Sequence, residues 1–90
     1  MVEERRLDGN AIGGVLLELF GAEMTTAIGM CDSCGAREQM ARADVYVDAP
    51  GIVVRCTHCK AVQLTIVRGP DRTWLNLTGL RSIEIRGAKT

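Results

Sequence analysis

Two Cys-x-x-Cys pairs constrain this chain more than any other feature of its sequence. The pairs are Cys31–Cys34 and Cys56–Cys59, and 21 residues separate them. A two-residue spacer lets both sulfurs of a pair turn toward one ion. Two such pairs supply the four sulfur ligands that zinc prefers, at Zn–S distances of about 2.3 Å. We therefore expect one structural zinc ion held by Cys31, Cys34, Cys56 and Cys59.

The residues beside the pairs agree with this interpretation. Gly35 follows the first pair, at a point where the backbone of such a turn needs freedom from Cβ strain, and Lys60 occupies the equivalent position after the second. Lys60, Arg37 and Arg55 can offset the negative charge of four thiolates. The segment between the pairs suits one antiparallel hairpin, with about ten residues on either side of a turn at Pro50-Gly51.

Other uses of the cysteines are less well supported. Each pair has the spacing of a dithiol redox motif, but neither opens a helix after a strand. An iron ion would accept the same four sulfurs, and the sequence alone does not separate it from zinc. His58, the only histidine, lies inside the second pair and could act as an alternative ligand or proton carrier. Since four thiolates complete the coordination shell and leave no open position for water, we expect His58 to be an exposed loop residue.

Hydrophobic periodicity predicts one helix followed by strands. A stripe at i, i+3, i+4, i+7 and i+8 predicts a helix over residues 10–20, capped by Asp8 or Asn10 and ended by Gly21. The stripe comprises Ile12, Val15, Leu16, Leu19 and Phe20. Residues 1–9 are expected to be a charged lead-in, and residues 24–86 a β-rich core with alternating segments near 24–30, 43–48, 52–54, 62–66, 73–77 and 83–85. The expected fold is a single small β-rich (α+β) zinc ribbon over residues 1–90, an antiparallel sheet with one N-terminal helix.

Charge and length limit the compartment and the partners. The 90 residues contain 11 Lys and Arg and 11 Asp and Glu, so the balance predicts no polyanion partner. The start lacks the pattern of a signal peptide, and the apolar stretch from Ala11 to Phe20 is too short to cross a bilayer and contains Glu18. We expect a cytoplasmic protein with no membrane partner, in which four cysteines bind metal rather than form disulfides.

No residue pattern predicts an enzyme. One histidine inside a metal knuckle makes a Ser-His-Asp arrangement implausible, and Gly9 to Gly14 match no phosphate-binding pattern. Asp44 and Asp48 could be paired acids, but with Tyr46 between them they fit the wet face of a half-buried strand. The expected role is therefore that of a non-enzymatic protein-interaction or accessory module.

The nature of the partner remains open between two classes. Nucleic acid is the alternative, because Trp74 could act as a stacking platform beside a basic stripe of Arg55, Lys60, Arg68, Arg72, Arg81 and Arg86. Trp74 is nevertheless expected in the core or as a hydrophobic lid, since large apolar residues are few. A protein partner is favoured, in the first instance a homodimer through a helix face formed by Gly13, Leu17 and Phe20. A redox or metal-sensing regulator is a third interpretation.

Several short motifs together resemble a family of bacterial proteins catalogued as a domain of unknown function with a zinc-ribbon core. The motifs are Leu7-Asp8-Gly9-Asn10, Phe20-Gly21, Cys31-x-x-Cys34-Gly35, Tyr46 followed by Pro50-Gly51, Arg55-Cys56-x-x-Cys59 and Thr73-Trp74-Leu75. The resemblance extends from Leu7 to Ile85 and implies a fold and a metal, but no activity.

The cysteine-containing half also resembles the zinc domain of hydrogenase-maturation nickel chaperones. This second resemblance rests on the paired cysteine knuckles, which many ribbons share. The nickel site of those proteins uses a histidine directly after the initiator methionine, whereas this chain has Val2 there. The resemblance therefore implies a zinc domain without the residue needed for nickel delivery.

Overall fold

A short strand and a helix open the described part of the chain. The computed structural model describes residues 6–48 and 51–85. Strand β1 (Arg6–Asp8) leads into a 3-10 helix, η1 (Gly9–Ile12), which continues as α1 (Gly13–Phe20). The Asp8 carboxylate accepts the N–H of Asn10 at 3.1 Å, and Gly21 ends α1 in the left-handed conformation, with φ of 70°. The predicted helix therefore has a 3-10 first turn, and part of the expected lead-in is a strand.

Five strands form the larger sheet, which we call sheet A. Its order is β1-β4-β5-β6-β7, and every neighbouring pair is antiparallel. Strand β4 (Asp44–Asp48) pairs with β5 (Gly51–Arg55), and β5 pairs with β6 (Val62–Arg68), which in turn pairs with β7 (Thr73–Asn76). Val45, Val54 and Leu64 lie on one face of these strands and are fully buried. The alternating pattern thus correctly predicted which face of the central strands meets the core.

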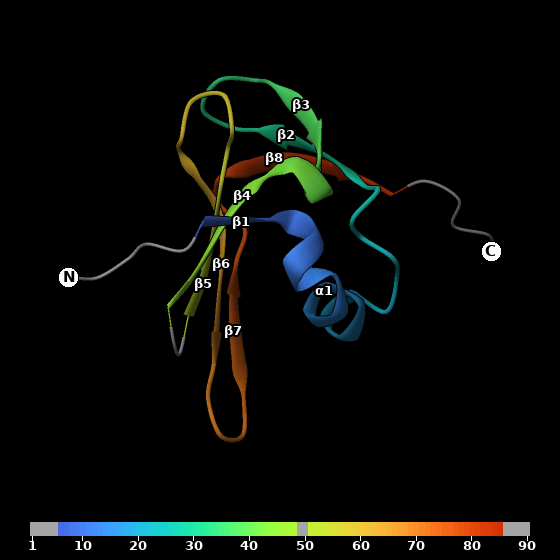
Figure 1. Cartoon of the computed structure of the whole chain (residues 1–90), viewed down its shortest axis with the longest axis vertical. Helices are drawn as coiled ribbons and strands as arrows, with labels where there is room; N and C mark the ends of the chain where they lie inside the picture. The colour runs from blue at the N-terminus through green and yellow to red at the C-terminus, as the bar shows by residue number, and fades with distance from the viewer. Residues whose placement is uncertain (1–5, 49–50, 86–90) are drawn as a thin grey trace.

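Three further strands form a second sheet, sheet B, which the sequence pattern did not separate from the first. Its order is β3-β2-β8, with β2 (Ile28–Cys31) between β3 (Arg37–Gln39) and β8 (Leu80–Glu84). A 3-10 turn, η2 (Met40–Arg42), carries the chain from sheet B to sheet A. The segment between the cysteine pairs is therefore not one hairpin: β3 belongs to sheet B, whereas β4 and β5 belong to sheet A (Figure 1).

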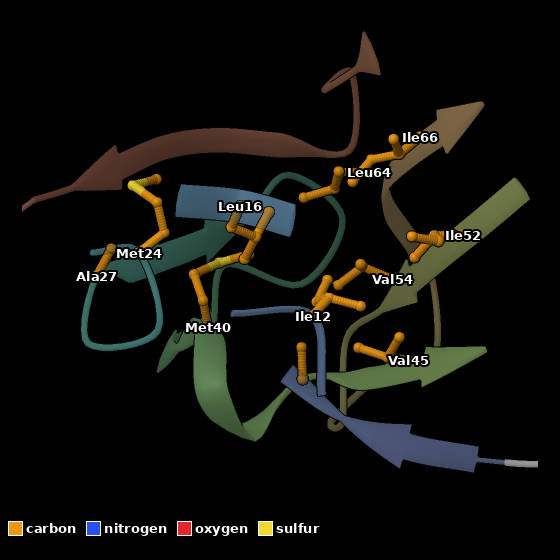
Figure 2. Close-up of a cluster of buried hydrophobic side chains, with 11 residues drawn as sticks. Ile12, Leu16, Met24, Ala27, Met40, Val45, Ile52, Val54, Leu64 and Ile66 are labelled. Carbon is orange, nitrogen blue, oxygen red and sulfur yellow. The ribbon is translucent and has the colours of Figure 1, made fainter. Parts of the chain in front are cut away.

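The hydrophobic core lies between α1 and the two sheets. Figure 2 shows Ile12 and Leu16 of the helical segment directed toward side chains of sheet A and toward Met40. Because aromatic residues are scarce, aliphatic and Met side chains fill this core. The buried cluster comprises Ile12, Leu16, Met24, Ala27, Met40, Ala43, Val45, Ile52, Val54, Leu64 and Ile66. The fold class, a small β-rich domain with antiparallel sheets and one N-terminal helix, is confirmed.

Two predicted side-chain environments are wrong. Trp74 is not in the core: 55% of it is exposed on sheet A, where its ring covers Gly69. Asp44, expected on a wet face, is only 8% exposed, because Lys60 lies over it and forms an ion pair at 3.0 Å. Tertiary packing determines the exposure of both side chains, and strand periodicity carries no information on that packing.

Some expectations fall outside the described residues. These are residues 1–5 of the lead-in, Ala49 and Pro50 of the predicted turn, Arg86 of the basic stripe and the side chain of Asp48. Within residues 6–48 and 51–85, no helix has the length and apolar character needed to cross a bilayer.

Candidate metal centre

The first cysteine pair forms a tight turn between β2 and β3. Cys31 ends β2, and its N–H donates to the carbonyl of Ala36 at 2.9 Å. The N–H of Gly35 donates back to the carbonyl of Cys31 at 2.9 Å. Gly35 has φ of 79°, a left-handed conformation that a residue without Cβ adopts without strain. The turn therefore favours glycine at the position where the sequence supplies it.

The second pair repeats this turn between β5 and β6. The N–H of Cys56 donates to Ala61 and the N–H of Lys60 donates to the carbonyl of Cys56, both at 2.9 Å. Lys60 has φ of 69°, the only positive φ of a non-glycine residue in the described part of the chain. The N–H groups of His58 and Cys59 point at the Cys56 sulfur, at 3.3 and 3.5 Å. The two pairs thus form matching turns whose backbone N–H groups face sulfur.

The two turns bring all four sulfurs together. The Sγ atoms of Cys31 and Cys59 are 3.7 Å apart, as are those of Cys34 and Cys56. All four sulfur atoms lie within 4.8 Å of one another. A tetrahedral ion with metal–sulfur bonds of about 2.3 Å would place its ligands about 3.8 Å apart. A disulfide needs about 2.05 Å, so the spacing fits a shared metal ion and not sulfur–sulfur bonds.

Burial divides the four ligands into two kinds. Cys31 and Cys56, the first of each pair, are 0% and 3% exposed, whereas Cys34 and Cys59 reach the surface. The buried sulfurs are anchored in the fold because each cysteine ends or follows a core strand. An ion bound here would face the protein on one side and solvent on the other.

The electrostatics of the site favour a thiolate at one position and a thiol at another. The backbone N–H groups of Cys34 and Ser33 lower the pKa of Cys31 to about 6, against the opposing effect of burial. The backbone N–H of Ala36 also favours a thiolate at Cys34. Partial desolvation and the neighbouring sulfurs outweigh it and raise the pKa of Cys34 to about 11. A cation bound here would displace the protons that remain on these sulfurs, because metal ligands must be deprotonated.

The nearby cations contact groups other than sulfur. Lys60 pairs with Asp44, and Arg55 donates to the Lys60 carbonyl at 2.8 Å. Arg37 pairs with Glu84 at 2.5 Å. These side chains hold the second turn and sheet B in place, while backbone N–H groups supply the hydrogen bonds to sulfur.

The sulfur cluster lies at the junction of the two sheets. Cys31 belongs to sheet B, whereas Cys56 follows β5 of sheet A, and both turns lie at the same end of the molecule in Figure 1. Gly79 adds a backbone link: it accepts from the N–H of Asp32 at 2.9 Å and donates to the carbonyl of Gln63 at 3.1 Å. A Cβ on Gly79 would lie 1.9 Å from the Val62 carbonyl oxygen. Strand periodicity gives no sign of this close contact.

The remaining candidate residues lie apart from the sulfur cluster. His58 is exposed, and only its backbone N–H contacts a ligand sulfur among the described interactions. Asp44 is held by Lys60. Gly9 packs against Met40, where a Cβ would lie 1.8 Å from the carbonyl oxygen, so this part of the Gly9–Gly14 segment serves close helix packing.

Comparison with known proteins shows the family of this chain. No curated protein and no solved structure matches it. One family model, described as a family of unknown function (DUF6510), matches residues 3–88. That match spans nearly the whole sequence and includes both cysteine pairs, so the chain belongs to the family of unknown function DUF6510.

Proposed function

We propose that this chain is a non-enzymatic protein-interaction module whose fold depends on one structural zinc ion. The observation that carries the proposal is the sulfur cluster between the sheets, with two edges of 3.7 Å. Four sulfurs complete the usual coordination of structural zinc, whereas catalytic zinc keeps a position for water or substrate. The residues present therefore fit zinc as a cross-link between sheet A and sheet B. In that role the ion supplies stability, and its ligands take part in no reaction.

An exposed apolar surface on sheet A supports the interaction role. Val45 and Val54 point into the core, so their strand neighbours Tyr46 and Val53 point to the opposite side. Tyr46 lies directly across from Val53, and Val67 lies directly across from Trp74, so each pair shares one face. We call Tyr46, Val53, Val67 and Trp74 the outer face. Val67 is 37% exposed and Trp74 55%, and an exposed apolar cluster on a small protein is a common binding surface.

The helix face proposed from the sequence has weaker support. Leu17 is 49% exposed and available to a partner. Gly13, however, faces Thr25, whose methyl carbon would lie 3.1 Å from a Cβ at that position. Phe20 packs against the core cluster. The strip of three thus offers one accessible apolar side chain, and we place the interaction surface on the outer face instead.

The nucleic-acid alternative is weakened by the pairing of its cations. Four residues of the expected basic stripe form ion pairs with carboxylates: Lys60 with Asp44, Arg68 with Glu18, Arg72 with Asp71 and Arg81 with Asp32. Arg55 donates to a carbonyl. A phosphate-binding surface needs an excess of positive charge, and these partners remove it. A protein partner therefore fits the surface better than a polyanion.

Affinity purification from the native host with a matched pair of variants tests the proposal. Val53→Lys places a charge on the outer face, and Val47→Lys places the same charge on the other face of the same hairpin, where Val47 is 49% exposed. We expect a protein partner that withstands nuclease and salt to bind the wild type and Val47→Lys but not Val53→Lys. Zinc content and melting temperature are measured for all three. Partners lost on nuclease treatment, or bound equally by folded Val53→Lys, would contradict the proposal.

A further inference from the structure

Strand β7 is an edge strand of sheet A, and unlike most edge strands it contains no charged residue. The edge strands are β1 and β7 in sheet A, and β3 and β8 in sheet B. Among these described edge strands, β1, β3 and β8 each contain at least one cation and one carboxylate, whereas β7 contains neither. All four β7 residues are exposed. Charged residues, prolines and bulges normally protect edge strands from pairing, and the segment from Thr73 to Thr78 contains no charge and no proline.

Among residues 6–48 and 51–85, no strand pairs with the outer side of β7, so its backbone presents free hydrogen-bonding groups in a definite pattern. The Gly69 N–H donates to the Arg72 carbonyl at 2.8 Å, which makes these residues a hydrogen-bonded pair at the tip of the β6–β7 hairpin. Hydrogen-bonded and non-hydrogen-bonded pairs alternate along an antiparallel ladder. The peptide groups of Trp74 and Asn76 therefore face β6, while those of Thr73 and Leu75 face the open edge.

This pattern is complementary to itself. When a second β7 lies antiparallel with Trp74 opposite Trp74, Thr73 of each copy lies opposite Leu75 of the other, and these residues can exchange their free hydrogen bonds. The two Trp74 side chains then form the non-hydrogen-bonded pair, in which cross-strand side chains are closest. Arg72 lies opposite Asn76, so no like charges meet. The Trp74 ring already rests over Gly69 on the outer face, so two rings would extend this face across both copies.

From these observations we infer that β7 pairs with β7 of a second copy, in antiparallel register centred on Trp74. The inference goes beyond the proposed function, because it concerns the edge of sheet A rather than its outer face, and its partner is a second copy of this chain. A second copy is favoured over an unrelated strand because one short uncharged segment satisfies both sides of a two-fold contact. The zero formal net charge of the chain adds little repulsion between copies. The hairpin tip lies at the opposite end of sheet A from the cysteine turns, so the metal centre stays outside the contact (Figure 1).

The first experiment measures the mass of the zinc-loaded full chain across a dilution series. We expect the wild type to be a dimer that dissociates on dilution, and Trp74→Lys to be a monomer throughout. Val47→Lys is the matched control, since Val47 is similarly exposed but lies on β4, and it should behave as the wild type. A wild type that is monomeric at every concentration would overturn the inference. A dimer that Trp74→Lys leaves intact and Leu17→Lys abolishes would assign the contact to the helix instead.

Charge complementation tests the register itself. Trp74→Lys and Trp74→Glu should each be monomeric alone and should form a mixed dimer when combined, because the inferred register places residue 74 opposite residue 74. Association of the mixture would also show that both variants are folded, since a poorly folded variant would not regain a partner. Failure of the mixture to associate, with both variants folded and zinc-loaded, would refute the register.

Amide hydrogen exchange gives an independent readout on the wild type. The N–H groups of Thr73 and Leu75 should exchange rapidly in dilute samples and become protected in concentrated ones, while the N–H of Trp74 should be protected in both. Equal protection of Thr73 at both concentrations would contradict edge pairing. If the wild type is monomeric but still binds a protein partner through Val53, the inference fails and the proposed function stands. An intact dimer without any protein partner that depends on Val53 would support the inference and contradict the proposed function.

Discussion

Gly79→Ala should be among the most damaging single-methyl changes in this chain. A Cβ at this position would lie 1.9 Å from the Val62 carbonyl oxygen and 2.6 Å from the Cα of Gln63. Both neighbours are backbone atoms of β6, so no side-chain rotation can make room. The loop must move away from β6, and the hydrogen bonds from Gly79 to Gln63 and from Asp32 to Gly79 must lengthen or break.

The size of the effect follows from those contacts. Two backbone hydrogen bonds contribute about 1 kcal/mol each, and overpacking of a closed site costs about 1–3 kcal/mol. We therefore expect the free energy of unfolding to fall by about 3–5 kcal/mol, out of roughly 5–13 kcal/mol for a chain of this length. The midpoint temperature should fall by about 12 °C or more. Because Asp32 lies inside the first cysteine turn, zinc should also be lost to a competing chelator more readily.

Gly14→Ala is the matched control for this change. Gly14 lies in α1, and the Cβ that the substitution would add lies more than 4 Å from every described heavy atom outside its chain neighbours and the backbone of its own helix. Alanine in a helix is more favourable than glycine by about 0.8–1.0 kcal/mol, so the same methyl group should stabilise the protein here. Thermal and urea unfolding of both zinc-loaded variants measure the contrast. A Gly79→Ala protein within about 0.5 kcal/mol of the wild type would refute the packing argument, since that range is typical of open surface sites.

The other predictions concern the metal and its ligands. Elemental analysis should find one zinc per chain. Removal of the metal should abolish cooperative unfolding, because structural zinc binds small domains with a free energy of about 10–16 kcal/mol. Substitution of any one of the ligands Cys31, Cys34, Cys56 and Cys59 should have the same effect. A metal-free chain with an unchanged melt would contradict this. His58→Ala should keep its zinc and melt within about 0.5 kcal/mol of the wild type, as its exposed side chain is not part of the sulfur cluster; loss of zinc would show that the ligand set differs. Since the pKa of Cys34 is raised to about 11, zinc binding at neutral pH should release protons, and apparent affinity should rise with pH. The dependence should steepen below pH 6, where Cys31 also holds a proton. Calorimetry in buffers of different ionisation enthalpy measures this, and zinc binding without proton release would contradict it.

Local spacing explains why the clustering of the four sulfurs was predictable. A Cys-x-x-Cys turn places its two sulfurs through backbone geometry within five residues, so its form depends little on the rest of the fold. The positive φ of Gly35 and Lys60 is a direct result of that geometry. The sequence therefore identified both the turn and the position at which a side chain is conformationally costly.

The division of the strands into two sheets was not predictable, because it depends on pairing between strands that lie far apart in the sequence. Strand β8 returns to pair with β2, about fifty residues earlier in the chain, and this contact creates sheet B. Periodicity describes one strand at a time and carries no information on which strands become neighbours. The burial of Asp44 under Lys60 and the exposure of Trp74 follow from the same limit, because each depends on a residue from another strand or turn.

The position of the four sulfurs between the two sheets defines how a bound ion would stabilise the fold. Sheets A and B share no strand, so no ladder of hydrogen bonds runs between them. Besides the chain segments that run between them, the described connections include the buried cluster, the two hydrogen bonds at Gly79 and the sulfur site. An ion held by the four sulfurs would therefore cross-link β2 to the end of β5 where no strand pairing joins the two sheets. Loss of the ion should separate the sheets at their cysteine end while the β4–β5–β6 ladder, which lies within sheet A, keeps its own hydrogen bonds.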